Sequence, residues 1–262
     1  MDVTVRSGGR KRGLFAEMKP GRLLDVPAGG GQQARALREL GYQVVTADLN
    51  PAAPVRAGID AAMADANAPL PFRSASFDYI LTREGIEHLE NQTGFIAECA
   101  RVLRPGGTIV LTTPNVMHLS ARISTFLTGQ RNLKRGLVNE VESLRSANGP
   151  HRYHGHVFLI DYFRLRYLMR LAGFDRLRVF TDRYSGTAIA LGWLAPLMYA
   201  ASRYAVAVST RRRRGKYPVA PRAVADEIMR HVFSSALLFG KRMIIVAEKT
   251  GPDSQPPSRA AS

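Results

Sequence analysis

The chain has 262 residues, of which 37 are Lys or Arg and 21 are Asp or Glu, so its formal net charge is +16. Its hydrophobic content of 45% is ordinary for a globular protein, and its length suits one sizeable α/β domain with insertions. The single cysteine, Cys99, excludes a disulfide within the chain. Residues 1–13 hold no apolar segment of the secretory kind, so we expect a cytoplasmic location.

The positive charge is concentrated in the later part of the chain. Residues 1–100 carry 11 basic and 12 acidic side chains, whereas residues 101–262 carry 26 and 9. This asymmetry favours an anionic partner for the later part, such as a phosphorylated substrate, lipid headgroups or nucleic acid. A solvated basic surface explains the same composition equally well.

At the start of the chain, residues 1–9 are expected to be flexible and residues 10–18 to form a short helix. The segment from residue 23 to residue 48 has the clearest pattern. It predicts a strand, a loop with glycines at 29–31, a helix and a second strand that ends at Asp48. Such a βαβ unit is typical of nucleotide-like ligands. Glycines let the backbone approach the ligand, and the terminal acid can accept hydrogen bonds from ribose hydroxyls.

Two cofactors use such a unit. The spacing Gly29-x-Gly31-x-x-Ala34 fits the G-x-G-x-x-G/A form of dinucleotide sites, although this signal alone is weak. Asp25, four residues before Gly29, favours S-adenosylmethionine instead. A carboxylate at that place would crowd a pyrophosphate, whereas a sulfonium and an amino group tolerate it.

The following segments alternate between strands and helices, and in their order they resemble class I S-adenosylmethionine-dependent methyltransferases. The matching segments are DVPAGGG (25–31), the strand ending in Asp48, MADAN (63–67), SFDYIL (76–81), EGIEHLEN (84–91), LRPGG (103–107) and TTPN (112–115). The resemblance implies an α/β fold with a doubly wound, seven-stranded Rossmann-like sheet. Its expected strand order is 3-2-1-4-5-7-6, with the last strand antiparallel and with helical insertions.

The same resemblance implies where S-adenosyl-L-methionine binds. Asp25 and the glycine loop would face its methionine and ribose part, Asp48 its ribose hydroxyls, and Asp65 its adenine. Pro27 departs from the family, which usually has glycine there, so the loop entry is expected to be stiffer. The cofactor-binding residues implied in this way are Asp25, Pro27, Ala28, Gly29, Gly31, Asp48, Leu49, Asp65, Ala66 and Arg83.

The TTPN strand end (112–115) and the H-x-x-x-F segment (154–158), which precedes a helix ended by AGF (172–174), resemble small-molecule methyltransferases of quinone biosynthesis and of glycan and lipid pathways. We therefore expect O-methylation of a small acceptor that is lipid-linked or anionic. A hydroxyl acceptor benefits from a general base. The histidines considered for this role are His118, His151, His154 and His156, and the candidates chosen from them are His154 and His156. The alternative, that these histidines order a loop or cap a helix, stays open. No Cys/His spacing indicates a metal site.

A single domain over residues 1–250 is expected, with insertions at about 115–158 and 182–240 and a disordered tail at 251–262. The second insertion contains 19 residues without charge, from Tyr184 to Ser202, followed by basic residues up to 216. A helical hairpin at 186–216 on an anionic membrane surface would fit this pattern, as would a helical pair packed on the domain or a dimer face.

Nucleic acid binding through the basic cluster of residues 211–216 is the alternative function. The segment Thr82–Gly85 after the fourth strand lacks the Asn/Asp-Pro-Pro-aromatic motif of enzymes that methylate amino groups of bases. No basic motif with interleaved aromatic residues supports the alternative either, so nucleic acid is the less favoured partner. The oligomeric state does not follow from the sequence.

Overall fold

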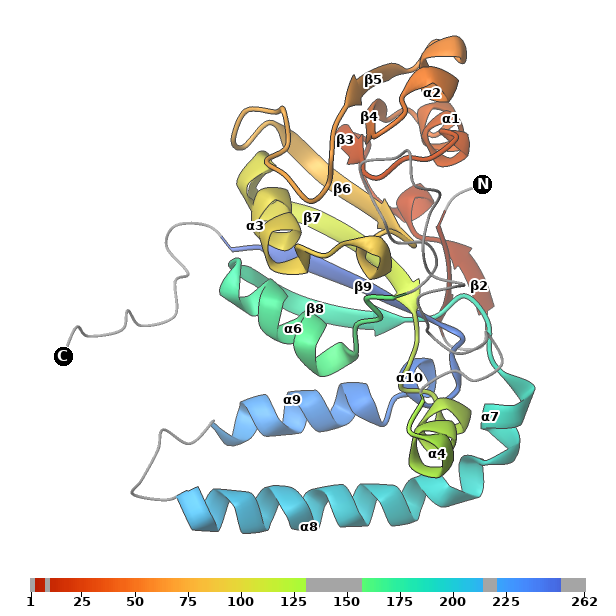
Figure 1. Ribbon diagram of the computed structural model, residues 1–262, viewed down its shortest axis with the longest axis vertical. Helices are drawn as coiled ribbons and strands as arrows, with labels where there is room; N and C mark the ends of the chain where they lie inside the picture. The colour runs from red at the N-terminus through yellow and green to blue at the C-terminus, as the bar shows by residue number, and fades with distance from the viewer. Residues whose placement is uncertain (1–2, 8–9, 131–156, 214–220, 251–262) are drawn as a thin grey trace, which may run out of the picture.

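The computed structural model describes residues 3–7, 10–130, 157–213 and 221–250. A seven-stranded sheet forms its centre, with helices packed on both faces (Figure 1). The strands of this sheet are β3 (Arg22–Asp25), β4 (Gln43–Asp48), β5 (Asp60–Met63), β6 (Phe77–Arg83), β7 (Leu103–Pro114), β8 (Phe174–Phe180) and β9 (Arg242–Lys249).

The strands lie in the order β5-β4-β3-β6-β7-β9-β8, which is 3-2-1-4-5-7-6 when they are counted along the chain. The five strands from β5 to β7 pair in parallel, and β9 pairs antiparallel with both β7 and β8. The predicted fold class, strand order and antiparallel last strand are therefore confirmed. The parallel arrangement places the carboxyl ends of β3, β4 and β6 at one edge of the sheet, where ligands bind in such folds.

Helices connect the strands and continue beyond them. The α-helices are α1 (Gln32–Glu39), α2 (Ala52–Arg56), α3 (Gln92–Val102), α4 (Leu119–Thr128), α6 (Tyr162–Leu171), α7 (Gly186–Ala190), α8 (Ala195–Arg213), α9 (Arg222–Val232) and α10 (Ser235–Phe239). Short 3-10 turns are η1 (Phe15–Glu17), η2 (Ile86–His88) and η4 (Gly192–Leu194).

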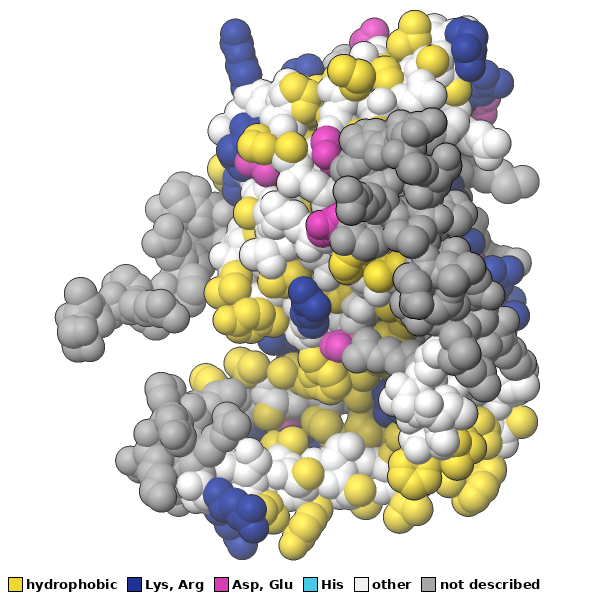
Figure 2. Space-filling model, in the orientation of Figure 1, with side chains coloured by type: hydrophobic (Ala, Val, Ile, Leu, Met, Phe, Trp, Pro, Cys, Tyr) yellow, Lys and Arg dark blue, Asp and Glu magenta, His cyan; other side chains and the backbone are white. Residues whose placement is uncertain are grey.

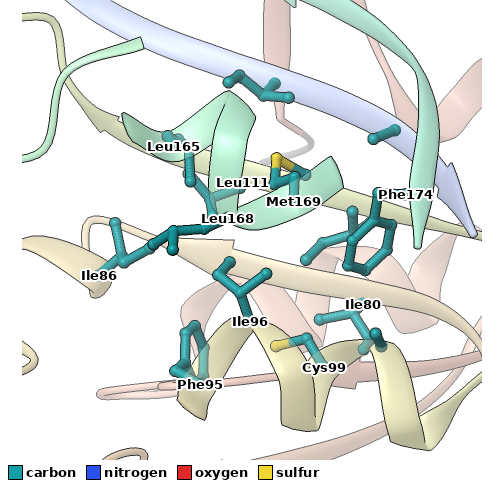
Figure 3. Close-up of a cluster of buried hydrophobic side chains, with 14 of the residues drawn as sticks. Ile80, Ile86, Phe95, Ile96, Cys99, Leu111, Leu165, Leu168, Met169 and Phe174 are labelled. Atoms are coloured by element: carbon teal, nitrogen blue, oxygen red, sulfur yellow. The ribbon is translucent and has the colours of Figure 1, made fainter. Parts of the chain in front are cut away.

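The larger hydrophobic core lies between the sheet and the helices α3 and α6 (Figure 3). Ile96 and Cys99 of α3 and Met169 of α6 are fully buried against the strands, beside Ile80 and Leu111 of the sheet. The spacing of 96 and 99 on one helix face is the reason that this segment buries a single stripe. The smaller core covers the other face, where α1 and the N-terminal segment pack.

The N-terminal segment corrects two expectations. Residues 4–7 were expected to be flexible but form the strand β1 (Thr4–Ser7), and residues 10–18 do not form a helix. Instead β2 (Arg10–Gly13) pairs antiparallel with β1, and only the turn η1 is helical. The reason is burial, because Val3, Val5 and Phe15 join the smaller core and the backbone N–H of Arg6 donates to the carbonyl of Thr181.

The segment between β8 and β9 contains α7, η4, α8, α9 and α10, so most of its described residues are helical, whereas Tyr184 and Gly240 pair in an isolated β-bridge. In Figure 1, α8 and α9 run side by side in opposite directions below the sheet. Within the described ranges, none of the helices combines the length and the apolar character that crossing a bilayer requires. The predicted disordered tail, 251–262, lies outside the described residues.

Candidate cofactor site at the carboxyl edge of the sheet

A pocket of about 310 Å³ lies at the carboxyl ends of β3, β4 and β6. Its volume is in the range of small-molecule sites, and its position is that of ligands in open α/β sheets. Six of the residues implied by the family resemblance line it, together with four others. The ten lining residues are Asp25, Pro27, Ala28, Gly29, Gly30, Gln32, Gln33, Asp48, Arg83 and Glu84.

Asp25 forms the buried floor of this pocket. It is the last residue of β3, its exposed fraction is 2%, and its Oδ2 has no hydrogen-bond partner among the described residues. Burial raises the pKa of this carboxyl to about 7, against the opposing effect of the Arg83 guanidinium and with a smaller contribution from Asp48. A buried oxygen without a partner is costly, so this site has a place for a ligand that brings a donor or a positive charge.

The glycine loop leaves the space above Asp25 open. A Cβ placed on Gly29 or Gly30 would meet no atom within 4 Å, and Gly29 has a φ of +53°, which favours glycine. Gly31 has a different role, because it begins α1 with a φ of +72° and a Cβ there would lie 3.1 Å from Pro54 Cγ. Gly31 therefore shapes the turn into the helix, while Gly29 and Gly30 border the pocket.

Asp48 joins the glycine loop to the end of β4. Its Oδ2 accepts a hydrogen bond of 2.8 Å from the backbone N–H of Gly29, and its Oδ1 accepts one of 3.0 Å from that of Asn50. Each carboxylate oxygen can accept a further hydrogen bond. The side chain thus holds the loop and still presents acceptors to a ligand with neighbouring hydroxyl groups.

Pro27 fits into the loop because Gly85 lies against it. A Cβ on Gly85 would come within 2.6 Å of both Cγ and Cδ of Pro27, so only glycine leaves room for the ring. The Val26–Pro27 peptide bond is cis. The loop is tied to both neighbouring strands by backbone hydrogen bonds, from Val26 to Leu81 and from Ala28 to Ala47. The departure from the family at position 27 is accommodated by the chain itself.

Glu84 is a pocket residue that the sequence analysis did not assign. It follows β6 directly and has a φ of +47°, an unusual backbone conformation for a residue with a side chain. The carboxylate is held by Thr112, whose Oγ1 donates to Oε1 at 3.3 Å, and by Arg242, whose Nε lies 3.5 Å from the same oxygen. Its place at the end of a strand was the available sequence signal, as it was for Arg83. Glu84 is also the first residue of the quoted segment 84–91.

The other residues that were missed lie in the glycine loop and the first turn of α1. Gly30, Gln32 and Gln33 all border the pocket. The run of three glycines indicated the first of them, whereas nothing in the pattern distinguished the two glutamines from ordinary helix residues.

Besides Gly31, three implied cofactor residues lie at the same edge but not in the lining of the described pocket. Leu49 follows β4 and is about half exposed, and Ala66 is buried after β5. Asp65 accepts a hydrogen bond of 2.9 Å from the backbone N–H of Asn67. Their assignment to the adenine and its surroundings stays a prediction.

The candidate general bases His154 and His156 lie outside the described residues, as does His151. The fourth histidine considered, His118, is the N-cap of α4. Its Nδ1 accepts a hydrogen bond from the backbone N–H of Ala121 at 3.2 Å and lies 2.8 Å from Oγ of Ser120. For His118, therefore, the capping role is the one that the structure shows.

Comparisons with known proteins agree with this geometry. Residues 9–179 match the family described as "Methyltransferase domain". The ubiquinone biosynthesis O-methyltransferase of Parvibaculum lavamentivorans is 36% identical over 103 residues, which are 36% of this chain and 40% of that protein. A probable S-adenosylmethionine-dependent methyltransferase of Mycolicibacterium smegmatis is 50% identical over 48 residues, which are 18% of this chain and 19% of that protein. The chain thus spans less than half the length of these curated relatives.

Solved structures show the same fold at low sequence identity. A methyltransferase of Thermotoga maritima, described as a possible histamine N-methyltransferase, has a TM-score of 0.53 and 14% identity, covering 89% of this chain and 84% of its own. A methyltransferase of Archaeoglobus fulgidus has a TM-score of 0.51 and 16% identity, covering 88% and 87%. The predicted family is confirmed, and with it S-adenosylmethionine as the cofactor of the family. The chain belongs to the methyltransferase domain family and has the class I S-adenosylmethionine-dependent fold.

Proposed function

We propose that this methyltransferase transfers the methyl group of S-adenosylmethionine to an oxygen of a small acceptor that is lipid-linked or anionic. The observation that carries the proposal is the pair of acids around the open glycine loop. Asp25 offers a buried oxygen without a partner among the described residues, and Asp48 offers acceptors at the rim. A ligand with a cationic methionine part and a ribose diol matches both.

The residues of the chain act by binding and alignment. When bound, S-adenosylmethionine supplies an electrophilic methyl carbon, which an acceptor oxygen attacks in line while the carbon–sulfur bond breaks and a neutral thioether remains. Asp25 compensates positive charge, Asp48 fixes the ribose, and Glu84, held by Thr112 and Arg242, forms the rim beyond β6. Fixing the reacting atoms in line lowers the entropic part of the barrier.

The choice of oxygen as the methylated atom rests on the curated relatives. The matched region of the Parvibaculum lavamentivorans protein belongs to an enzyme named for O-methylation in ubiquinone biosynthesis. A hydroxyl acceptor must lose its proton, and His154 or His156 is the base that we propose for this step, on the basis of the sequence. Basic residues beyond position 100 would favour an anionic acceptor group.

The experiment is an acceptor comparison with purified protein and S-adenosylmethionine. It measures formation of S-adenosylhomocysteine and the mass of the product with a polyprenyl-substituted catechol, a catechol without the lipid tail, a primary amine and a short RNA. We expect O-methylated catechol, with a kcat/KM at least about tenfold above that for the amine. Methylation of the amine or the RNA alone, by protein that binds S-adenosylhomocysteine, would overturn the proposal.

A further inference from the structure

The helices α4, α7, η4 and α8 expose large apolar side chains to an unusual degree. Exposed fractions reach 85% for Phe126, 73% for Trp193 and 74% for Tyr204. Single exposed apolar residues need no explanation, but a contiguous group marks an interaction site. We name the following group the apolar helical surface: Phe126, Leu127, Ile189, Trp193, Leu197 and Tyr204.

These residues belong to one surface because their helices are packed together on the inside. Leu119 of α4, Ala188 of α7 and Leu238 of α10 form a small buried cluster, against which Met198 of α8 also packs. Figure 2 shows apolar side chains gathered over α4 and α7 at the lower right, and more of them along α8 at the lower edge. The small cluster therefore holds the helices together on the inside, while their outer sides are exposed.

The charge on this part of the chain has one sign. The sequence contains no Asp or Glu between Asp182 and Asp226, and α8 carries Arg203, Arg211, Arg212 and Arg213. Arg203 is paired with Asp226 at 2.7 Å, which ties α8 to α9. Arg211 and Arg212 are exposed near the end of α8. Exposed apolar and aromatic side chains beside arginines match a bilayer surface with anionic headgroups.

We propose that the apolar helical surface and the arginines at the end of α8 dock this protein onto an anionic phospholipid bilayer. Trp193 and Tyr204 would lie at the depth of the headgroups, with Phe126, Leu127 and Leu197 inserted further. A second copy of this chain fits the surface less well. It would bring the same arginines, and the segment between residues 182 and 226 offers no carboxylate to pair with them.

Part of the docking surface, the helices α4 and α7, lies at the same edge of the sheet as the cofactor pocket, whereas α8 runs from there beneath the sheet (Figure 1). Helix α4 follows the carboxyl end of β7 and α7 follows that of β8, and both strands run in the same direction as β3 and β6. A docked bilayer would therefore touch the molecule, through α4 and α7, at the edge of the sheet where the pocket opens. A role of this contact in the approach of a lipid-linked acceptor rests on the proposed function, whereas docking itself does not.

The test is flotation of the full chain with vesicles, either of phosphatidylcholine alone or with about one third phosphatidylglycerol. The double variants Trp193→Ser/Leu197→Ser and Arg211→Gln/Arg212→Gln each remove one component, and Val55→Ser removes an exposed apolar side chain on α2 as the matched control. We expect binding to the anionic vesicles only. Each double variant should lower the bound fraction by on the order of tenfold, and raised salt should weaken the wild type most.

Calorimetric affinity for S-adenosylhomocysteine, measured on every variant, separates docking from the proposed function. We expect this affinity to stay unchanged in the two surface variants. Equal flotation of wild type and both double variants would overturn the docking proposal. So would a dimer in sedimentation velocity that the Trp193→Ser/Leu197→Ser change dissociates in the absence of lipid, because the surface would then be covered by a second copy.

Discussion

At the scale of single residues, the two acids of the cofactor site have opposite environments. Asp25 is buried with one oxygen unpartnered among the residues described, and its pKa is raised to about 7. Asp48 lies at the rim, where two backbone N–H groups donate to its carboxylate. A buried acid is sensitive to pH and to nearby charge, whereas a hydrogen-bonded acid at the rim is suited to recognising hydroxyl groups.

Asp48→Ala is expected to weaken binding of S-adenosylhomocysteine by one to two orders of magnitude. The loss corresponds to about 2 kcal/mol for charge-assisted hydrogen bonds to the ribose. Isothermal titration calorimetry measures it. The matched control is Asp60→Ala, which removes an exposed carboxylate at the start of β5, away from the pocket lining. Unchanged affinity in Asp48→Ala would show that the ribose lies elsewhere.

Asp25→Asn is expected to change how stability depends on pH. Because the pKa of Asp25 is about 7 in the folded state and about 3.8 when exposed, the folded protein binds more protons between these values. Its free energy of unfolding therefore decreases as pH rises through this window, and the penalty is fully present above pH 7. The variant lacks this term, so its stability relative to wild type should increase from pH 5 to pH 8, by on the order of 2 kcal/mol.

Urea unfolding of both proteins at several pH values measures this difference, in which the contributions of titrating groups that do not interact with Asp25 cancel. A difference that stays constant from pH 5 to pH 8 would contradict the raised pKa of Asp25.

The contact between Pro27 and Gly85 can be tested by a double-mutant cycle. Gly85→Ala introduces a Cβ within 2.6 Å of the proline ring, which should destabilise the protein by about 1–3 kcal/mol and displace the loop. In Pro27→Gly protein the ring is absent, so Gly85→Ala should cost much less. Denaturant unfolding and cofactor titration give the two readouts. Equal costs in both backgrounds would mean that the ring does not require glycine at 85.

The residues of the site could be predicted where they follow a strand end in a recognisable pattern. Asp25, Gly29, Asp48 and Arg83 lie in the pocket lining because parallel strands bring their carboxyl ends together. Glu84 also follows a strand end, directly after β6, but the contacts of its carboxylate with Thr112 and Arg242, which are distant in sequence, could not be predicted from a local pattern.

At the scale of elements, Asn115 links the end of β7 to the segment before β9. Its Nδ2 lies within hydrogen-bond distance of the carbonyl oxygens of Leu237 at 3.0 Å and Gly240 at 2.8 Å, and of Ala236 at 3.4 Å. Its Oδ1 accepts from the backbone N–H of Met117. The buried amide thus joins the start of the α4 region to α10, and it explains why the segment TTPN ends in asparagine.

Asn115→Ala is expected to destabilise the protein by about 2–3 kcal/mol, because buried carbonyl groups lose their donor. Chemical unfolding measures this value. The matched control is Asn91→Ala at the N-cap of α3, which loses two exposed hydrogen bonds, the one that Oδ1 accepts from the backbone N–H of Gly94 and the one that Nδ2 donates to the carbonyl of Asn67, at a cost of about 1 kcal/mol. Equal free energies of unfolding for the two variants would show that the buried link between β7 and α10 stabilises the protein no more than an exposed helix cap does.

The elements with strong periodicity were predictable, and those stabilised by distant partners were not. The helix α3 begins after Asn91 and ends at Val102, where a cap and an apolar stripe coincide. The strand β2 was expected to be helical. Its sequence, Arg10–Gly13, is basic and gives no strand signal, and it pairs because β1 places Val3 and Val5 in the core.

At the scale of the whole molecule, the excess of positive charge and the cofactor pocket belong to different parts of the chain. The half of the chain that builds the pocket is nearly neutral, and the basic excess lies beyond residue 100. The order of the strands, 3-2-1-4-5-7-6, was predicted from the family resemblance. The structure has the antiparallel β9 between β7 and β8, as this order requires. The exposed outer sides of α4 and α8 did not follow from the sequence, which fitted packed helices equally well.

The most direct test of the central claim is calorimetric titration of the purified chain with S-adenosylhomocysteine, with NAD as the control ligand. The pocket with Asp25 in its floor and Asp48 at its rim predicts micromolar binding of S-adenosylhomocysteine and no measurable binding of NAD. Binding of NAD alone, or of neither ligand by well-folded protein, would contradict the assignment of this pocket to S-adenosylmethionine.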